Sequence, residues 1–330
     1  MRELAQMTPD DAILVTGAGG FIGGHLVRRL LELGYGDVRA VDITPLGEWH
    51  QLDSRAENVR GDLRQRDACD AAAAGRAFLF NFAADMGGMG FIETHKADCM
   101  VSVLINTNLL LAARDAGARR YFFASSACVY AADRQRDSDV VALRETDAYP
   151  ADPEDGYGWE RLFSERMCRH FMEDYGLEAR VARFHNIYGP HSAYQGGREK
   201  APAAICRKVI EAQQSGSLEI EIWGDGSQMR SFTYIDDCIE GTLRLMSSDV
   251  RQPLNVGSSE VVSINELVSL VEHLAGVTLS RRYKLDAPMG VRGRNSDNSL
   301  ICEKLGWEPS TPLLTGMQAT YEWIRSEMRT

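Results

Sequence analysis

Ser126 and Cys128 place a hydroxyl and a thiol two residues apart, directly after an apolar run. That run, residues 120–124, predicts a buried strand, so both side chains would lie at a strand end. Tyr157 opens an amphipathic helical pattern further along the chain, and Arg161 follows one turn later on the same face. We expect the chemistry to lie where this strand end and this helix meet.

Gly17, Gly20 and Gly23 lie between an apolar strand and a helical pattern that runs from Phe21 to Leu33. Glycines there permit a tight turn and let the backbone meet a pyrophosphate, and the helix N-terminus adds free N–H groups. Asp42 ends the next strand, where its carboxylate would bind both hydroxyls of an adenosine ribose and repel a 2′-phosphate. The sequence therefore predicts an NAD site made of Gly17, Gly20, Phe21, Ile22, Gly23, Asp42, Asp62 and Leu63, the last two at the adenine edge.

The elements that position these residues alternate between strand and helix. Apolar strands are predicted at 12–16, 38–42, 78–82, 120–124 and 179–184, and helices at 21–33, 98–116 and 157–175. Nearly continuous apolar strands separated by helices predict a doubly wound parallel sheet, the Rossmann arrangement of an α/β protein.

The alternation of strands and helices ends after Phe184, where glycine and proline residues that indicate loops become frequent. Helices are predicted at 201–214, 235–247, 263–275 and 314–328, and short strands at 218–223 and 253–256. We expect a smaller mixed α/β lobe that binds the substrate. The predicted division is 1–184 with about 230–256 for the NAD-binding domain, and 185–229 with about 257–330 for the second lobe.

Composition narrows the class of protein. The chain has 330 residues, 44% of them hydrophobic, and a net charge of -11, which argues against nucleic acid as the main partner. No apolar run approaches the roughly 18–20 residues of a membrane span, and residues 1–6 lack the apolar core of a signal peptide, so we expect a cytoplasmic protein. Seven cysteines without a CxxC pair indicate reduced thiols rather than disulfides or a zinc site, and no metal site is predicted.

Five runs of sequence resemble the extended short-chain dehydrogenase/reductases that act on nucleotide sugars. They are AADMGGMGFI at 83–92, SSAC at 125–128, FHNIYGP at 184–190, GGREKAPAA at 196–204 and GVRGRNSDN at 290–298. The first and fourth are not general to that superfamily, and they resemble the GDP-mannose 3,5-epimerase family. The resemblance extends from residue 17 to about residue 325.

The resemblance assigns an oxidoreductive role to Tyr157 and Arg161, both in contact with NAD. The superfamily has Tyr-x-x-x-Lys at this place: the tyrosine takes the proton of an alcohol, and the lysine holds the nicotinamide ribose and lowers the pKa of the tyrosine. Arg161 keeps the charge but is bulkier and cannot relay a proton. Ser126 would hydrogen-bond the reacting oxygen, with Ser125 as the alternative.

The resemblance further implies hydride removal from C4 of the mannose, which acidifies the hydrogens on C3 and C5. Cys128 and Lys200 are then the acid and base on the two faces of the ring. The expected products are GDP-L-galactose and, by inversion at C5 alone, GDP-L-gulose. Nucleotide-sugar 4,6-dehydratases carry an aspartate where this chain has Ala127, so elimination of water is not expected.

Contacts to the sugar and diphosphate are expected from nine residues. They are Gly87, Gly88, Asn186, Lys200, Lys208, Trp223, Gln228, Arg230 and Arg294. Trp223 would line a guanine pocket, or else be packed in the core. A homodimer through helices 98–116 and 157–175 is the family expectation, although their apolar faces would suit a core equally well. An epimerase or dehydrogenase of another nucleotide sugar, and an inactive NAD-binding scaffold, are the alternative functions.

Overall fold

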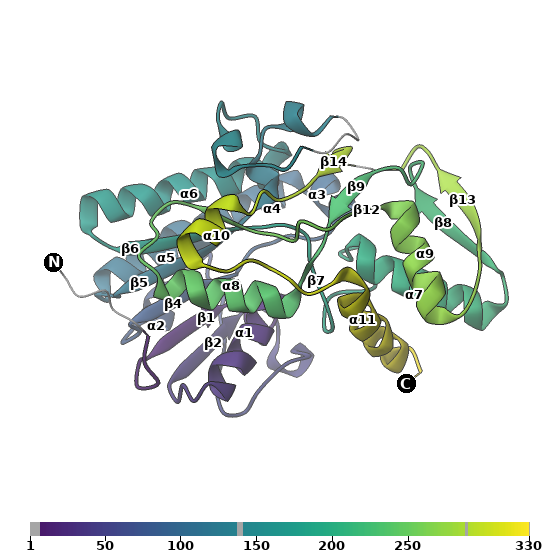
Figure 1. Ribbon diagram of the computed structural model, residues 1–330. Helices are drawn as coiled ribbons and strands as arrows, with labels where there is room; N and C mark the ends of the chain where they lie inside the picture. Colours follow the sequence, from purple (N-terminus) through teal and green to yellow (C-terminus); the bar gives the residue numbers. More distant parts are fainter. Residues whose placement is uncertain (1–6, 137–140, 288–289, 330) are drawn as a thin grey trace.

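A seven-stranded parallel sheet organises the larger part of the molecule (Figure 1). The computed structural model describes residues 7–136, 141–287 and 290–329, so the predicted absence of a signal peptide at 1–6 concerns residues outside this range. The strand order is β11-β6-β5-β4-β1-β2-β3, and every neighbouring pair is parallel. The predicted doubly wound sheet is therefore confirmed. Its strands are β1 (Ile13–Thr16), β2 (Val38–Asp42), β3 (Glu57–Arg60), β4 (Phe78–Asn81), β5 (Arg120–Ser126), β6 (Glu178–Phe184) and β11 (Leu254–Val256).

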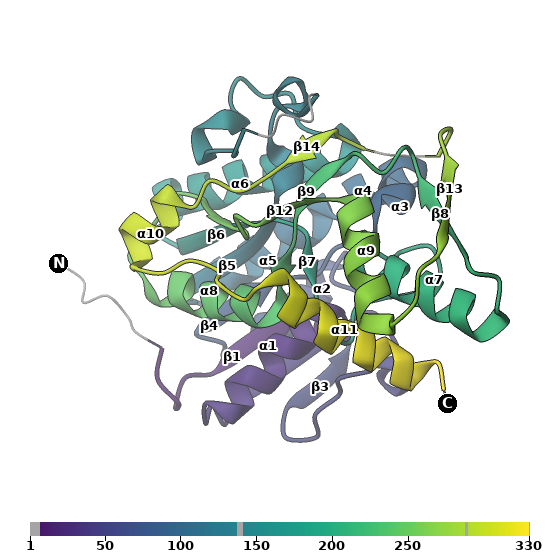
Figure 2. The same cartoon turned by 45° about the vertical axis from the view of Figure 1, so that its right-hand side comes forward.

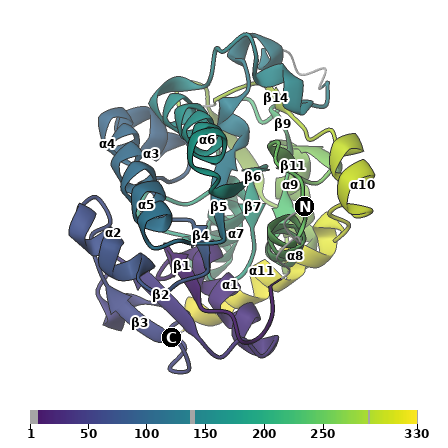
Figure 3. The ribbon, with the colours of Figure 1, turned by 90° about the vertical axis from the view of Figure 1, so that its left-hand side faces the viewer.

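Helices cover both faces of this sheet, because successive side chains of each buried strand point to opposite faces. On one face, α1 (Phe21–Glu32) and α8 (Ile235–Ser247) bury Leu26 and Ile239 against Val15 and Phe80. On the other, α2 (Arg66–Ala73), α5 (Val103–Asp115) and α6 (Asp155–Tyr175) cover strand residues such as Leu79. Figure 3 shows the two helical layers on either side of the sheet.

The second lobe is built around a separate core (Figure 2). Its main helices are α7 (Ala201–Ser215), α9 (Ile264–Ala275) and α11 (Leu313–Glu327). Its short strands form three small sheets: β8 (Glu219–Trp223) with β13 (Ser280–Lys284), β9 (Met229–Ser231) between β12 (Val261–Ser263) and β14 (Gly293–Arg294), and β7 (Ile187–Tyr188) with β10 (Thr233–Tyr234). From β10 the chain returns to the large sheet through α8 and β11.

The remaining elements are short. They are α3 (Met89–Thr94), α4 (Lys96–Val101), α10 (Ser299–Leu305) and the 3-10 turns η1 (Leu46–Glu48), η2 (Ala127–Val129), η3 (Ala132–Gln135) and η4 (Glu145–Ala148). The predicted helix 98–116 is wrong as one unit, since it divides at Ser102, whose hydroxyl accepts a hydrogen bond from the Asp85 amide at 2.9 Å. Sequence patterns missed β3, an exposed edge strand, and α3, which is too short to show a period.

The stretch Lys96–Asp115 is long and apolar enough to cross a membrane by length and composition alone. Such a signal is weak, because core helices pass the same test. Here α5 packs between α2 and α6, and it buries Leu109 and Leu110 against the sheet. The core therefore explains the buried apolar residues of this helix.

Candidate active site

The glycine turn after β1 forms a close-fitting cradle. A Cβ added to Gly23 would lie 2.2 Å from the Gly17 carbonyl oxygen, so the turn closes only with glycine there. Gly17 itself has a φ of +71°. Because α1 begins at the next residue after Gly20, its free N–H groups face the same space. This geometry fits the pyrophosphate of a dinucleotide.

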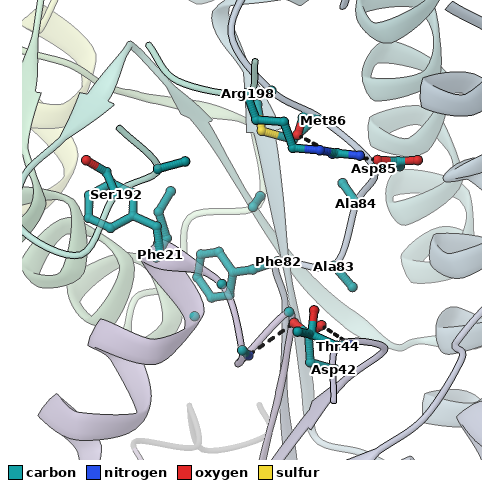
Figure 4. A pocket seen from close by; sticks show the side chains of 18 of the residues that line it. Phe21, Asp42, Thr44, Phe82, Ala83, Ala84, Asp85, Met86, Ser192 and Arg198 are labelled. Atoms are coloured by element: carbon teal, nitrogen blue, oxygen red, sulfur yellow. Dashed lines mark hydrogen bonds and ion pairs between the residues drawn. The ribbon is translucent and has the colours of Figure 1, made fainter. Parts of the chain in front are cut away.

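A cavity of about 980 Å³ extends from this turn along the strand ends. It is lined by all the residues predicted to bind NAD: Gly17, Gly20, Phe21, Ile22, Gly23, Asp42, Asp62, Leu63, Tyr157 and Arg161. The Asp42 carboxylate accepts hydrogen bonds from the amides of Gly19 (3.1 Å) and Thr44 (2.9 Å). Figure 4 shows Asp42 beside Thr44. Asp62 is paired with Arg64 at 2.8 Å. The residues present fit an NAD molecule with its ribose at Asp42.

Ser126 and Ser125 face different partners at the end of β5. The Ser125 hydroxyl donates to Glu165 at 2.5 Å, and Glu165 is in turn paired with Arg183 inside the core. Both serines line the cavity, but Ser126 accepts a hydrogen bond from the Cys128 amide at 3.2 Å. Because the Ser125 hydroxyl is bonded to Glu165 and Ser126 lies beside Tyr157, the geometry favours Ser126 over the alternative Ser125 as the partner of a reacting oxygen.

Tyr157 is buried at the first turn of α6. Burial raises the pKa of its phenol to about 12, although the positive charge of Arg161 and a hydrogen bond with Ser126 act in the opposite direction. The Arg161 guanidinium carbon lies 5.2 Å from the centre of the Tyr157 ring. The cation beside the ring therefore opposes the effect of burial and favours the phenolate, the form that can accept a proton.

Arg161 forms an ion pair with a carboxylate that the sequence patterns did not identify. Its Nε donates to Glu160 at 2.5 Å, and its Nη1 donates to the Ala124 carbonyl at 3.0 Å. The Ser164 hydroxyl also donates to Glu160, at 2.8 Å. The guanidinium is held by the strand and by its helical neighbour, so its position beside Tyr157 is fixed before any ligand binds.

Cys128 lies in η2, in contact with a charged pair. Arg294 of β14 approaches its Sγ at 3.6 Å through Nη1, and donates to Glu154 at 2.6 Å and to Gln135 at 2.7 Å. Burial raises the pKa of the Cys128 thiol, Glu154 raises it further, and Arg294 lowers it. The sequence assigned Arg294 to the diphosphate or sugar and did not identify Glu154 or Gln135. No local pattern connects residues so far apart in the chain.

Lys200 occupies the N-cap position of α7, with a proline in the first turn of that helix. Burial lowers the pKa of its ammonium group, and the charge of Arg294 lowers it further, while Cys128 raises it. A lysine with a lowered pKa releases a proton more readily near neutral pH.

The loop before α3 determines where Lys200 lies. The Gly88 amide donates to the Arg198 carbonyl at 2.9 Å, and a Cβ on Gly88 would lie 2.2 Å from the Glu199 carbonyl oxygen. Arg198 also donates to Asp85 (2.7 Å) and to the Met86 carbonyl (3.0 Å), as Figure 4 shows. The two loops are thus joined by backbone and side-chain contacts beside the cavities.

A second cavity, of about 470 Å³, lies between the sheet and the smaller lobe. It is lined by Ser126, Cys128 and Tyr157 and by all nine residues predicted to contact the substrate: Gly87, Gly88, Asn186, Lys200, Lys208, Trp223, Gln228, Arg230 and Arg294. Ser126, Tyr157 and Lys200 line both cavities, which therefore meet at these residues. A hydride donor in one and an acceptor in the other would face each other here.

The distal part of this cavity contains an exposed aromatic ring and a cation. Trp223 is 42% exposed, so it is not the packed core residue that the sequence left open. The Lys208 ammonium lies 5.8 Å from the centre of the Trp223 ring and donates to the Glu221 carbonyl at 3.0 Å. Asn186 donates to the Ser231 carbonyl at 2.9 Å, and Gln228 to the Trp223 carbonyl at 3.1 Å. An exposed indole beside a cation suits a base and its diphosphate.

Within residues 7–136, 141–287 and 290–329, no group of three or more His, Cys, Asp or Glu side chains is arranged to hold a metal ion.

Residues 13–257 match the model of the NAD dependent epimerase/dehydratase family. GDP-mannose 3,5-epimerase 1 of Oryza sativa subsp. japonica is 46% identical over 323 residues, which cover 96% of this chain and 82% of the rice protein.

Two solved structures with a similar fold contain a nucleotide sugar. UDP-glucose 4-epimerase from Thermotoga maritima, solved with UDP-glucose, superposes with a TM-score of 0.86 at 26% identity, covering 96% of this chain and 99% of that one. MoeE5, solved with UDP-glucose and NAD, has a TM-score of 0.78 at 30% identity, with 96% and 99% coverage.

Proposed function

Because the chain belongs to the NAD dependent epimerase/dehydratase family, we propose that it inverts GDP-D-mannose at C3 and C5, giving GDP-L-galactose and, by inversion at C5 alone, GDP-L-gulose. The relative at 46% identity carries that activity in its name. When bound, NAD supplies reversible hydride transfer at C4. The enzyme is an isomerase, since the substrate shows no net redox change.

The residues of the chain divide the reaction into two kinds of proton transfer. Tyr157 accepts the proton of the C4 hydroxyl and later returns it, with Ser126 hydrogen-bonded to the same oxygen. Once C4 is a ketone, a carbanion at C3 or C5 is stabilised as an enolate. Cys128 and Lys200 then remove and return protons at these carbons from opposite faces of the ring. Ala127 offers no acid to expel a hydroxyl, so the carbon skeleton keeps all its oxygens.

The observation that carries the proposal is that a thiol, an amine and a phenol line one cavity. Cys128 comes from η2, Lys200 from the start of α7, and Tyr157 from α6. All three line the 470 Å³ cavity. A 4-epimerase needs only the phenol, since inversion at C4 involves no carbon acid. The additional thiol and amine support chemistry at neighbouring carbons.

Product analysis with a panel of sugar nucleotides tests the proposal. Purified protein is incubated separately with GDP-mannose, UDP-glucose and dTDP-glucose, and the sugars are identified by NMR. The proposal predicts new hexose diastereomers from GDP-mannose alone. Conversion of UDP-glucose to its C4 epimer would make the chain a 4-epimerase, and no conversion of any of the three would support the inactive scaffold.

The proposed assembly is a homodimer in the cytoplasm. Met100 and Leu104 on α4 and α5, and Trp159 and Phe163 on α6, are large apolar residues each at least 47% exposed. Trp159 and Phe163 are four residues apart and so lie on one face of α6, while Met100 and Leu104 lie on the two sides of the break at Ser102. The helices α4 and α5 pack beside α6, which makes the four side chains one apolar surface suited to the same surface of a second copy.

A further inference from the structure

Glu154 is a buried carboxylate that takes no part in the proposed proton transfers at C3, C4 and C5. It lies directly before α6, and its side chain is 15% exposed. Its backbone amide donates to the Cys128 carbonyl at 2.9 Å, while its carboxylate accepts a hydrogen bond from Arg294 at 2.6 Å and raises the pKa of the Cys128 thiol. Backbone and side chain of one residue thus act on the same cysteine.

Arg294 is held against this pair from the other lobe. Its three nitrogens reach Gln135, Cys128 and Glu154, and its side chain is 4% exposed. Gln135 is fixed in turn, since its side chain donates to the carbonyls of Tyr130 and Ala131 at 3.3 Å. The guanidinium therefore cannot turn toward a diphosphate without breaking a buried ion pair.

We propose that Glu154 and Arg294 are the positioning residues for Cys128. The carboxylate keeps the proton on the sulfur in the resting protein. The guanidinium stabilises the thiolate after that proton has moved to the enolate carbon. In the reverse direction the guanidinium stabilises the thiolate before it takes a proton from carbon. The carboxylate then keeps that proton on the sulfur. Because the carboxylate and the guanidinium are bonded to each other, their charges stay together throughout.

The proton transfer between Cys128 and carbon rests on the proposed function, whereas the test of the two partners of Cys128 needs no substrate. Other groups that interact with Cys128 are Ser126 of β5, Tyr157 of α6, Lys200 at the start of α7 and Arg230 of β9. These groups are unchanged in the Glu154 and Arg294 variants. Any shift in the pH midpoint of Cys128 alkylation therefore reports the loss of Glu154 or Arg294.

The test is the pH dependence of Cys128 alkylation by iodoacetamide in the full chain without sugar nucleotide. Labelling is followed at the Cys128 peptide by mass spectrometry, because the other six cysteines are then resolved separately. The midpoint of the profile is compared rather than the rate, since a more acidic thiol is also a weaker nucleophile. Glu154→Gln removes the carboxylate charge, and Arg294→Met removes the guanidinium.

Opposite shifts are expected. The midpoint should fall by roughly one pH unit or more in Glu154→Gln and rise by a similar amount in Arg294→Met, as expected when a charge close to a titrating group is removed. Glu93→Gln is the matched control: this carboxylate of α3 is near Glu154 and does not act on Cys128, so the midpoint should not move. Glu154→Asp, which keeps the charge, should restore most of the wild-type midpoint.

Shifts in the same direction, or no shift in either variant while NAD binding is retained, would overturn the proposal. If Glu154→Gln does not fold, an unmoved midpoint in Arg294→Met alone has the same force. A protein that shows the opposite shifts but does not convert GDP-mannose would refute the proposed function and leave this assignment standing. Conversion of GDP-mannose with unmoved midpoints would support the proposed function and overturn the assignment of Glu154 and Arg294.

Discussion

Tyr157 has an unusual pKa for a residue that must accept a proton, and Arg161 is the cation placed to correct it. Burial raises the pKa of the Tyr157 phenol from its usual value near 10 to about 12. Replacing Arg161 by Met removes a positive charge that favours the phenolate, so the pKa of Tyr157 should rise further and the rate of C4 oxidation should fall about tenfold or more, one pKa unit being a factor of ten. The difference in tyrosinate absorbance between each protein and its Tyr157→Phe counterpart measures the first effect, and NADH formation the second.

Arg161→Lys is the matched control for charge. It should keep most of the activity, because a lysine can still donate to Glu160 and stay near the ring. An Arg161→Met protein that oxidises the sugar as fast as the wild type would show that the cation is not needed.

Cys128 and Lys200 can be separated from the redox residues by isotope exchange. Cys128→Ala should slow, by roughly a hundredfold or more, the solvent exchange of the carbon-bound hydrogen on the face of the ring that Cys128 serves, since a positioned acid or base contributes at least this much. Oxidation at C4 should continue, because Tyr157 and Ser126 are untouched. The measurement compares deuterium uptake with transient NADH absorbance in the same sample. Loss of both signals together would mean that Cys128 supports the whole site rather than proton transfer at carbon.

At the scale of elements, the contact between the glycine loop and the start of α7 determines the position of Lys200. Gly88→Ala would force a Cβ against the Glu199 carbonyl oxygen, so the two loops must separate and Lys200 must move. We expect hydrogen exchange at carbon to fall by about tenfold or more, because small misplacements of catalytic groups are costly, while NAD affinity is retained. Gly90→Ala serves as the control, since its Cβ would meet the Trp223 ring only at 3.4 Å. Equal losses in both variants would contradict the argument.

The sequence could predict the elements whose signal is local. The glycine turn, Asp42 at a strand end and the Tyr157–Arg161 spacing lie within single strand–helix units, and the doubly wound sheet follows from their alternation. Resemblance supplied Cys128 and Lys200. Glu154 and Gln135 were missed because Arg294 lies 140 and 159 residues from them in the chain, so only the fold joins them. Glu160 was missed for a different reason, since a single carboxylate beside an arginine is indistinguishable from ordinary helix surface until its burial is known.

At the scale of the whole molecule, the apolar surface of α4, α5 and α6 predicts the assembly. Phe163→Glu places a charge at its centre, and a buried unpaired charge is costly enough to separate the subunits. The mass in solution, measured by light scattering, should fall from that of a dimer to that of a monomer. Leu314→Glu, on the similarly exposed Leu314 of α11, should leave the mass unchanged. A wild-type protein that is already monomeric would contradict the proposed homodimer.

One NMR measurement tests the central claim, that oxidation at C4 allows proton transfer at C3 and C5. GDP-mannose with ordinary hydrogen is converted in heavy water, and the hydrogens of the product hexoses are read individually. The account predicts that H3 and H5 are replaced by deuterium in GDP-L-galactose while H4 persists, because the hydride taken from C4 is returned to it without meeting solvent. Products that retain H3 and H5, or that lose H4 to solvent, would contradict it.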